Sequence, residues 1–129
     1  LVNDLWQGLS SIIPLASLSA PLQYASLVVM TMVIAVLSTL PAMPSIFTPM
    51  AAAVSQTIGW PVDATILAQV PAFVLFMFPY QAPPIIIGIA MLGVPVRQAM
   101  KLLVSHTFTG LLILVPLHYL WGRAIGVFP

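Results

Sequence analysis

The feature that most constrains this chain is a proline-interrupted polar segment, FPYQAPP at residues 78–84, within a long apolar stretch. It lies between apolar runs at 66–77 and 85–92. Neither run alone has the roughly 20 residues that a spanning helix needs, but together they do. Because polar, proline-broken backbone is costly inside a bilayer unless it lines a cavity or a site, this pattern is typical of the discontinuous helix of a transporter. We predict such a helix over residues 62–92.

The composition indicates an integral membrane protein. The chain is 61% hydrophobic and 4% charged, whereas an ordinary soluble domain carries about 25% charged residues. The net charge of +1 argues against nucleic acid as a partner, and the absence of cysteine excludes disulfides and thiolate metal sites. We therefore expect an all-α, multi-pass protein of the cell (inner) membrane, with the lipid bilayer as its main surroundings.

The first 22 residues predict an interfacial or partly embedded helix followed by a linker. They contain Trp6, a residue that favours membrane interfaces, but no basic segment followed by an apolar core, which argues against a signal peptide. Since the chain begins at Leu1, we interpret its start as an internal cut. Its 129 residues suit one half of an inverted-repeat transporter. The expected partner is then the N-terminal repeat of the same polypeptide.

Residues 23–58 predict a re-entrant helical hairpin. Its apolar arms, Gln23–Leu37 and Ser45–Ile58, would each be roughly 20 Å long, which is short of the 30 Å hydrocarbon core. The polar patch STLPAMP at 38–44 separates the arms. One long kinked helix is the alternative, but two nearby prolines together with Ser and Thr exceed what a kink needs.

A final transmembrane helix is expected over residues 98–122. Arg97 precedes it and Lys101 lies in its first turn, which places that end in the cytoplasm by the positive-inside rule. The broken helix would then run inward, and the hairpin would open outward. The last helix carries two histidines without acidic neighbours, which we interpret as core or interface residues, and a polar face that we interpret as a helix-packing face. These residues are His106 and His118, and Ser105, Thr107, Thr109 and Gly110.

The two interruptions supply the candidate binding residues. If both reach the middle of the membrane, hydroxyls, an amide and unpaired backbone groups come together there. The helices that follow each interruption would direct their positive N-terminal dipoles inward, which suits an anion. The preceding carbonyls would suit a small cation. The alternative is that the serine and threonine residues only pack between helices. The candidate substrate-binding residues are Ser38, Thr39, Ser45, Tyr80, Gln81, Pro83 and Pro84.

No enzymatic activity is expected. The apolar parts of the predicted spans lack Asp and Glu, with Asp63 only at the first turn of the broken helix, so an embedded general acid or base would have to be one of two histidines. No metal site and no organic cofactor are predicted. The leading hypothesis is a secondary transporter or a fragment of one. The alternative is a non-transport scaffold or assembly subunit, in which the broken helices pack against a partner.

Over residues 23–129 the chain resembles the divalent anion:sodium symporter family, which includes sodium-coupled dicarboxylate and sulfate carriers. The family has a membrane-dipping hairpin with Ser-Asn-Thr at its tip, and these positions fall on 39–41. Its broken helix carries Leu-Pro-x-x-Thr-Pro-Pro-Asn, which aligns with 78–85. The order, spacing and proline pair agree. This sequence departs from the family at Leu40 and Ile85, which replace asparagines, and at Ala82, which replaces the threonine.

The resemblance implies a secondary active transporter, or its C-terminal repeat, that moves a small anion such as a carboxylate or sulfate. It implies Na+ as the candidate coupling ion, a homodimer, and an elevator movement of the hairpin and broken helix. It also implies an ion site that would use backbone carbonyls at Thr39, Leu40, Ala82 and Ile85. The three departures indicate a divergent branch.

Overall fold

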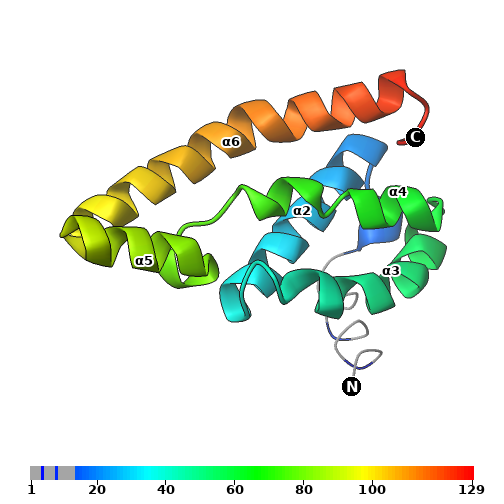
Figure 1. The fold of residues 1–129 in the computed structure, drawn as a ribbon. Coiled ribbons are helices and arrows are strands. Elements are labelled where there is room, and N and C mark those ends of the chain that lie inside the picture. Colours follow the sequence, from blue (N-terminus) through cyan, green and yellow to red (C-terminus); the bar gives the residue numbers. More distant parts are fainter. Residues whose placement is uncertain (1–3, 5–7, 9–13) are drawn as a thin grey trace.

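The structure is a computed structural model that describes Asp4, Gly8 and residues 14–129, and these residues are helical and contain no strand. Figure 1 shows helices α2, α3 and α4 gathered on one side, α5 projecting from the other, and α6 running along both. In chain order the elements are η1 (Leu15–Ser17), α2 (Ala20–Leu37), α3 (Met43–Ile58), α4 (Val62–Leu67), η2 (Val70–Phe73), η3 (Pro79–Gln81), α5 (Pro83–Leu92) and α6 (Val96–Ala124).

Helices α2 and α3 form an antiparallel pair joined by residues 38–42, which we call the hairpin turn. Each helix has a proline in its first two positions, Pro21 and Pro44, where the missing N–H costs little. Helix α3 ends at Gly59, whose φ of 73° is the left-handed conformation that terminates helices. Proline therefore marks the start of both helices, and glycine marks the end of α3.

The expected broken helix is interrupted earlier than predicted. The sequence predicts a first half over Val62–Phe78, but α4 ends at Leu67 and only the short 3-10 helix η2 follows. The cause is Pro71, which lacks an N–H and whose ring conflicts with the carbonyl four residues back, that of Leu67. Residues 74–82, which we call the break, then run in irregular and 3-10 conformation up to α5.

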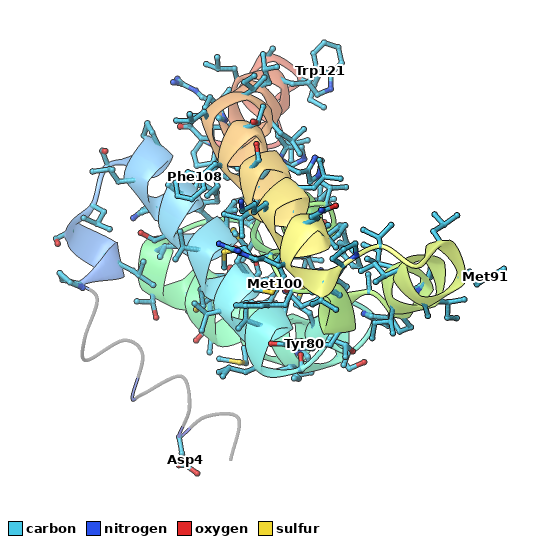
Figure 2. All side chains as sticks on the ribbon, turned by 90° about the vertical axis from the view of Figure 1, so that its left-hand side faces the viewer. Asp4, Tyr80, Met91, Met100, Phe108 and Trp121 are labelled. Atoms are coloured by element: carbon cyan, nitrogen blue, oxygen red, sulfur yellow. The ribbon has the colours of Figure 1, made fainter. Side chains whose placement is uncertain are left out.

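Helix α5 and the first half of α6 form an arm that projects from the rest of the protein (Figure 1). Gly93, with φ 62°, ends α5, and Pro95 precedes α6. No residue of α5 is buried. Met91 and Trp121 are 81% and 67% exposed, and Figure 2 shows both pointing away from the protein. The arm therefore presents a largely apolar surface.

The apolar core lies among α2, α3, η2 and the C-terminal end of α6. Two described helices, α2 and α6, are long and apolar enough to cross a membrane, which indicates membrane association. They overlap the first arm of the predicted hairpin and the predicted last helix: α2 begins three residues earlier than expected, and α6 extends two residues beyond each expected end. Of the segment predicted over residues 1–22, residues 1–3, 5–7 and 9–13 lie outside the described residues.

Candidate functional site

The hairpin turn and the break meet at one contact, which we call the junction. The backbone N–H of Leu40, in the hairpin turn, donates a hydrogen bond of 2.9 Å to the carbonyl of Gln81 in the break. The Tyr80 hydroxyl donates to the carbonyl of Val36 in the last turn of α2. That carbonyl is one of four that a helix end leaves without an intrahelical partner. Two segments more than 40 residues apart in sequence are therefore hydrogen-bonded to each other.

Gln81 is the central residue of the junction, and its side chain is 0% exposed. Its Oε1 accepts hydrogen bonds from the backbone N–H groups of Met77 and Phe78, at 2.9 and 2.8 Å. Since both neighbours are donors, the amide must direct its oxygen toward them and its NH2 group the other way. Among the described residues no acceptor pairs with Nε2. A buried amide donor without a partner is costly and calls for a ligand or water.

Helix α6 pairs with the other side of the break. The Thr107 hydroxyl donates to the carbonyl of Phe76 at 2.8 Å, and Nε2 of His106 contacts the carbonyl of Val74 at 2.9 Å. A carbonyl only accepts, so the His106 nitrogen carries the proton. The sequence assigned Thr107 to helix packing and His106 to the core or interface, and it missed their contacts with the break. The one signal in the sequence was that two adjacent polar residues occur in the last helix of a chain whose preceding helix is interrupted.

The hairpin side chains contribute less to the junction than the sequence predicts. The Ser38 hydroxyl donates at 2.7 Å to the carbonyl of Ile34 within its own helix end. Ser45 is exposed in the first turn of α3. Thr39 is half-buried, and its carbonyl accepts from the N–H groups of Ala42 and Met43 in the hairpin turn.

The residues that follow Gln81 form the start of α5. Pro83 and Pro84 are exposed in its first turn, whereas Ala82 and Ile85 are half-buried. The Ala82 carbonyl accepts from the N–H of Ile85 at 2.9 Å. The carbonyls of Thr39 and Ala82, two of the predicted cation ligands, are thus already engaged in turns. Of the predicted site residues, Leu40, Tyr80 and Gln81 are the ones whose hydrogen bonds join the hairpin turn, the end of α2 and the break.

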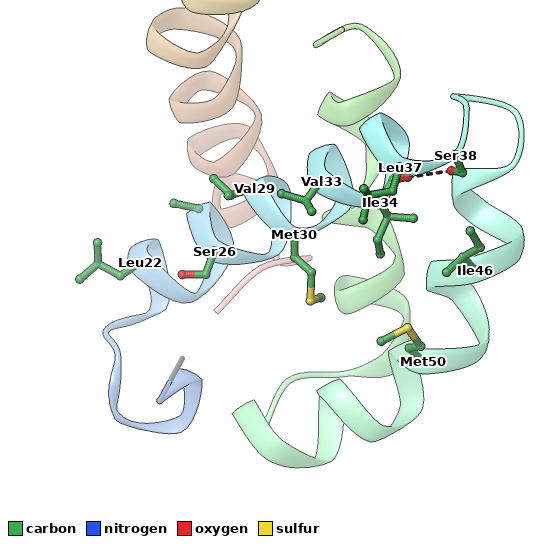
Figure 3. A pocket seen from close by; sticks show the side chains of 11 residues that line it. Leu22, Ser26, Val29, Met30, Val33, Ile34, Leu37, Ser38, Ile46 and Met50 are labelled. Carbon is green, nitrogen blue, oxygen red and sulfur yellow. Dashed lines mark hydrogen bonds between the residues drawn. The ribbon is translucent and has the colours of Figure 1, made fainter. Parts of the chain in front are cut away.

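A groove lies between α2 and α3 and extends to Ser38 at the start of the hairpin turn. It has a volume of about 580 Å³ and is lined by apolar side chains with two serines, Ser26 and Ser38. Figure 3 shows Ile46 and Met50 of α3 facing the side chains of α2 across it. Tyr80 and Gln81 do not line it. An apolar groove of this kind suits lipid or another helix better than a small polar solute.

In the described part of the chain no group of three His, Asp or Glu side chains is placed to hold a metal ion. No family model, curated protein or solved structure matches the chain.

Proposed function

We propose that this chain is part of a secondary transporter that moves a small anion, such as a carboxylate or sulfate, through a site at the junction. The observation that carries the proposal is the hydrogen bond between Leu40 and Gln81, which joins the two interruptions. Secondary transporters place their sites where interrupted helices meet near the middle of the membrane. In this proposal α2 and α3 form a re-entrant hairpin, and residues 62–92 form the discontinuous helix.

The helix starts at the junction support an anion. Helix α3 begins three residues after Leu40, and α5 begins two residues after Gln81. Figure 1 shows the two helices extending from this region in opposite directions, so their N-terminal ends face it. Each end carries a partial positive charge. The unpaired Nε2 donor of Gln81 adds a third group that favours a hydrogen-bond acceptor.

The remaining parts of the proposal rest on the resemblance. They are the homodimer, the N-terminal repeat as the other half of the transporter, the elevator movement and Na+ as coupling ion. The Thr39 carbonyl already accepts two N–H groups, whereas the Ala82 carbonyl accepts one and can offer a cation its second lone pair. Coupling is tested by comparing uptake in Na+ and in K+ buffers.

The test uses single cysteines introduced into the whole transporter, to which this part contributes no cysteine of its own. Tyr80→Cys replaces a side chain that is 43% exposed beside the junction, and Val29→Cys replaces one that is 52% exposed in the apolar groove. In proteoliposomes, Tyr80→Cys should react with a membrane-impermeant thiol reagent, and sulfate, phosphate or succinate should protect it. Val29→Cys should react slowly and without protection.

The same proteoliposomes measure uptake of radiolabelled sulfate, phosphate and succinate. Uptake of at least one of them is expected, and Gln81→Ala should abolish it at unchanged abundance. Absence of uptake together with unprotected Tyr80→Cys would refute the transporter proposal.

A scaffold or assembly subunit is the second candidate, and the projecting arm favours it. Helix α5 buries no residue, and much of α6 exposes large apolar side chains, so the arm offers a surface for another subunit. A scaffold predicts that cysteines at residues 86 and 112, on α5 and α6, cross-link to a partner. It also predicts that Tyr80→Cys resists the reagent.

A further inference from the structure

One peptide group in the break is held at both ends. The carbonyl of Phe76 and the N–H of Met77 belong to the same planar amide unit. The carbonyl accepts from the Thr107 hydroxyl at 2.8 Å, and the N–H donates to Oε1 of Gln81 at 2.9 Å. A single rigid unit therefore connects α6 to the side chain of Gln81.

The Thr107 hydroxyl is used differently from four other threonine hydroxyls in the helices. A threonine in a helix usually bonds a carbonyl three or four residues back in its own helix. Four threonines do so here: Thr31, Thr57, Thr65 and Thr109. Thr107 is 1% exposed and instead reaches a carbonyl 31 residues earlier in the chain. Its hydroxyl therefore serves the break and not its own helix.

Helix α6 approaches the break closely at Gly110. A Cβ atom added there would lie 2.3 Å from Cδ2 of Leu75, so a side chain at this position would force the Leu75 side chain to shift. Gly110 and Thr107 are neighbours on one face of α6, three residues apart. Together they set the distance between α6 and the break.

We propose that Thr107 is a positioning residue that sets the orientation of the Gln81 amide through the 76–77 peptide group. A bond to the carbonyl polarises the amide and strengthens its N–H as a donor. That N–H in turn directs Oε1 of Gln81 toward the break and Nε2 toward the solute. The inference rests on the proposed function, since it assigns Thr107 a role in the same site.

The experiment compares Thr107→Val, which keeps shape but removes the hydroxyl, with Thr107→Ser, which keeps the hydroxyl. Thr109→Val is the matched control, since the Thr109 hydroxyl bonds only within α6. Uptake of sulfate, phosphate and succinate gives KM and kcat. Amide exchange at Met77, followed by NMR on protein labelled with 15N-methionine, reports the peptide group directly.

For Thr107→Val we expect KM to rise about fivefold, the worth of one hydrogen bond, with kcat unchanged. Hydrogen exchange of the Met77 amide should also accelerate about fivefold. Thr107→Ser should restore both values, and Thr109→Val should change neither.

The outcomes separate the two proposals. If the wild-type protein carries none of the three anions but Thr107→Val still accelerates exchange at Met77 and Thr107→Ser reverses it, the positioning role stands and the transport proposal fails. If uptake occurs and Thr107→Val leaves KM and exchange unchanged, the positioning role is overturned and transport stands. A folded Thr107→Ser that behaves like Thr107→Val also overturns it.

Discussion

Gln81→Met tests how the break is stabilised. Methionine has nearly the shape of glutamine but offers no strong acceptor, so the substitution leaves the N–H groups of Met77 and Phe78 without Oε1. It also removes the Nε2 donor, which has no partner among the described residues. We therefore expect the variant to lose the stabilisation of two hydrogen bonds. Removing the unpaired Nε2 donor should offset part of that loss.

The size of the effect follows from burial. Leaving a buried donor without an acceptor costs about 1–3 kcal/mol. Met77 and Phe78 are half-buried, so the lower end of that range applies, about 1 kcal/mol for each. Relief of the Nε2 donor offsets part of this sum. We expect the unfolding free energy to fall by about 1–2 kcal/mol.

The control is Gln69→Met, the same substitution at a second buried glutamine. Its Oε1 accepts no hydrogen bond from the described residues, so this variant should keep or slightly raise the unfolding free energy. Stability is measured by SDS titration in mixed micelles, with helicity followed by circular dichroism. If Gln81→Met matches Gln69→Met within about 0.5 kcal/mol, Gln81 does not stabilise the break and the assignment of its amide is wrong.

Three further variants are measured in the same titration. Gly110→Ala places a Cβ atom 2.3 Å from the Leu75 side chain and should cost about 1–3 kcal/mol through overpacking; an unchanged value would contradict the close approach of α6. Trp60→Phe removes a buried bond of 2.7 Å to Gln23 and should cost about 1 kcal/mol, and no loss would mean that water replaces it. Tyr80→Phe removes a half-exposed hydroxyl bond at the junction and should cost under about 1 kcal/mol, so a larger loss would show that the bond is shielded from water.

The helix boundaries were largely predictable because proline and glycine mark them locally. Pro44 and Pro83 lie in the first turn of their helices, where a backbone N–H has no partner within the helix and its absence costs little. Gly59 ends α3 with a positive φ. The early end of α4 was predictable by the same rule, since Pro71 conflicts with the carbonyl of Leu67. The prediction failed there because the apolar run 66–77 outweighed the proline within it.

The junction was predictable only in outline. The sequence singles out Gln81 and the hairpin turn, but which atoms meet depends on how α2 and the break pack. Ser45 shows the limit, because one turn of α3 carries it out to the exposed surface. Thr107 shows the converse, since nothing local distinguishes its hydroxyl from that of Thr109. Partners 31 residues away in sequence are set by tertiary packing.

The break owes its shape to side chains outside the broken helix as much as to its own prolines. Prolines remove hydrogen bonds, but they do not satisfy the groups that are released, and in a bilayer each unsatisfied group costs several kcal/mol. Here the carbonyls of Val74 and Phe76 are taken by α6, while the N–H groups of Met77 and Phe78 are taken by Gln81. The carbonyl of Gln81 is taken by the hairpin turn. Residues 62–92 alone would leave most of these groups unpaired, so the interrupted conformation is a property of the assembled hairpin, break and last helix.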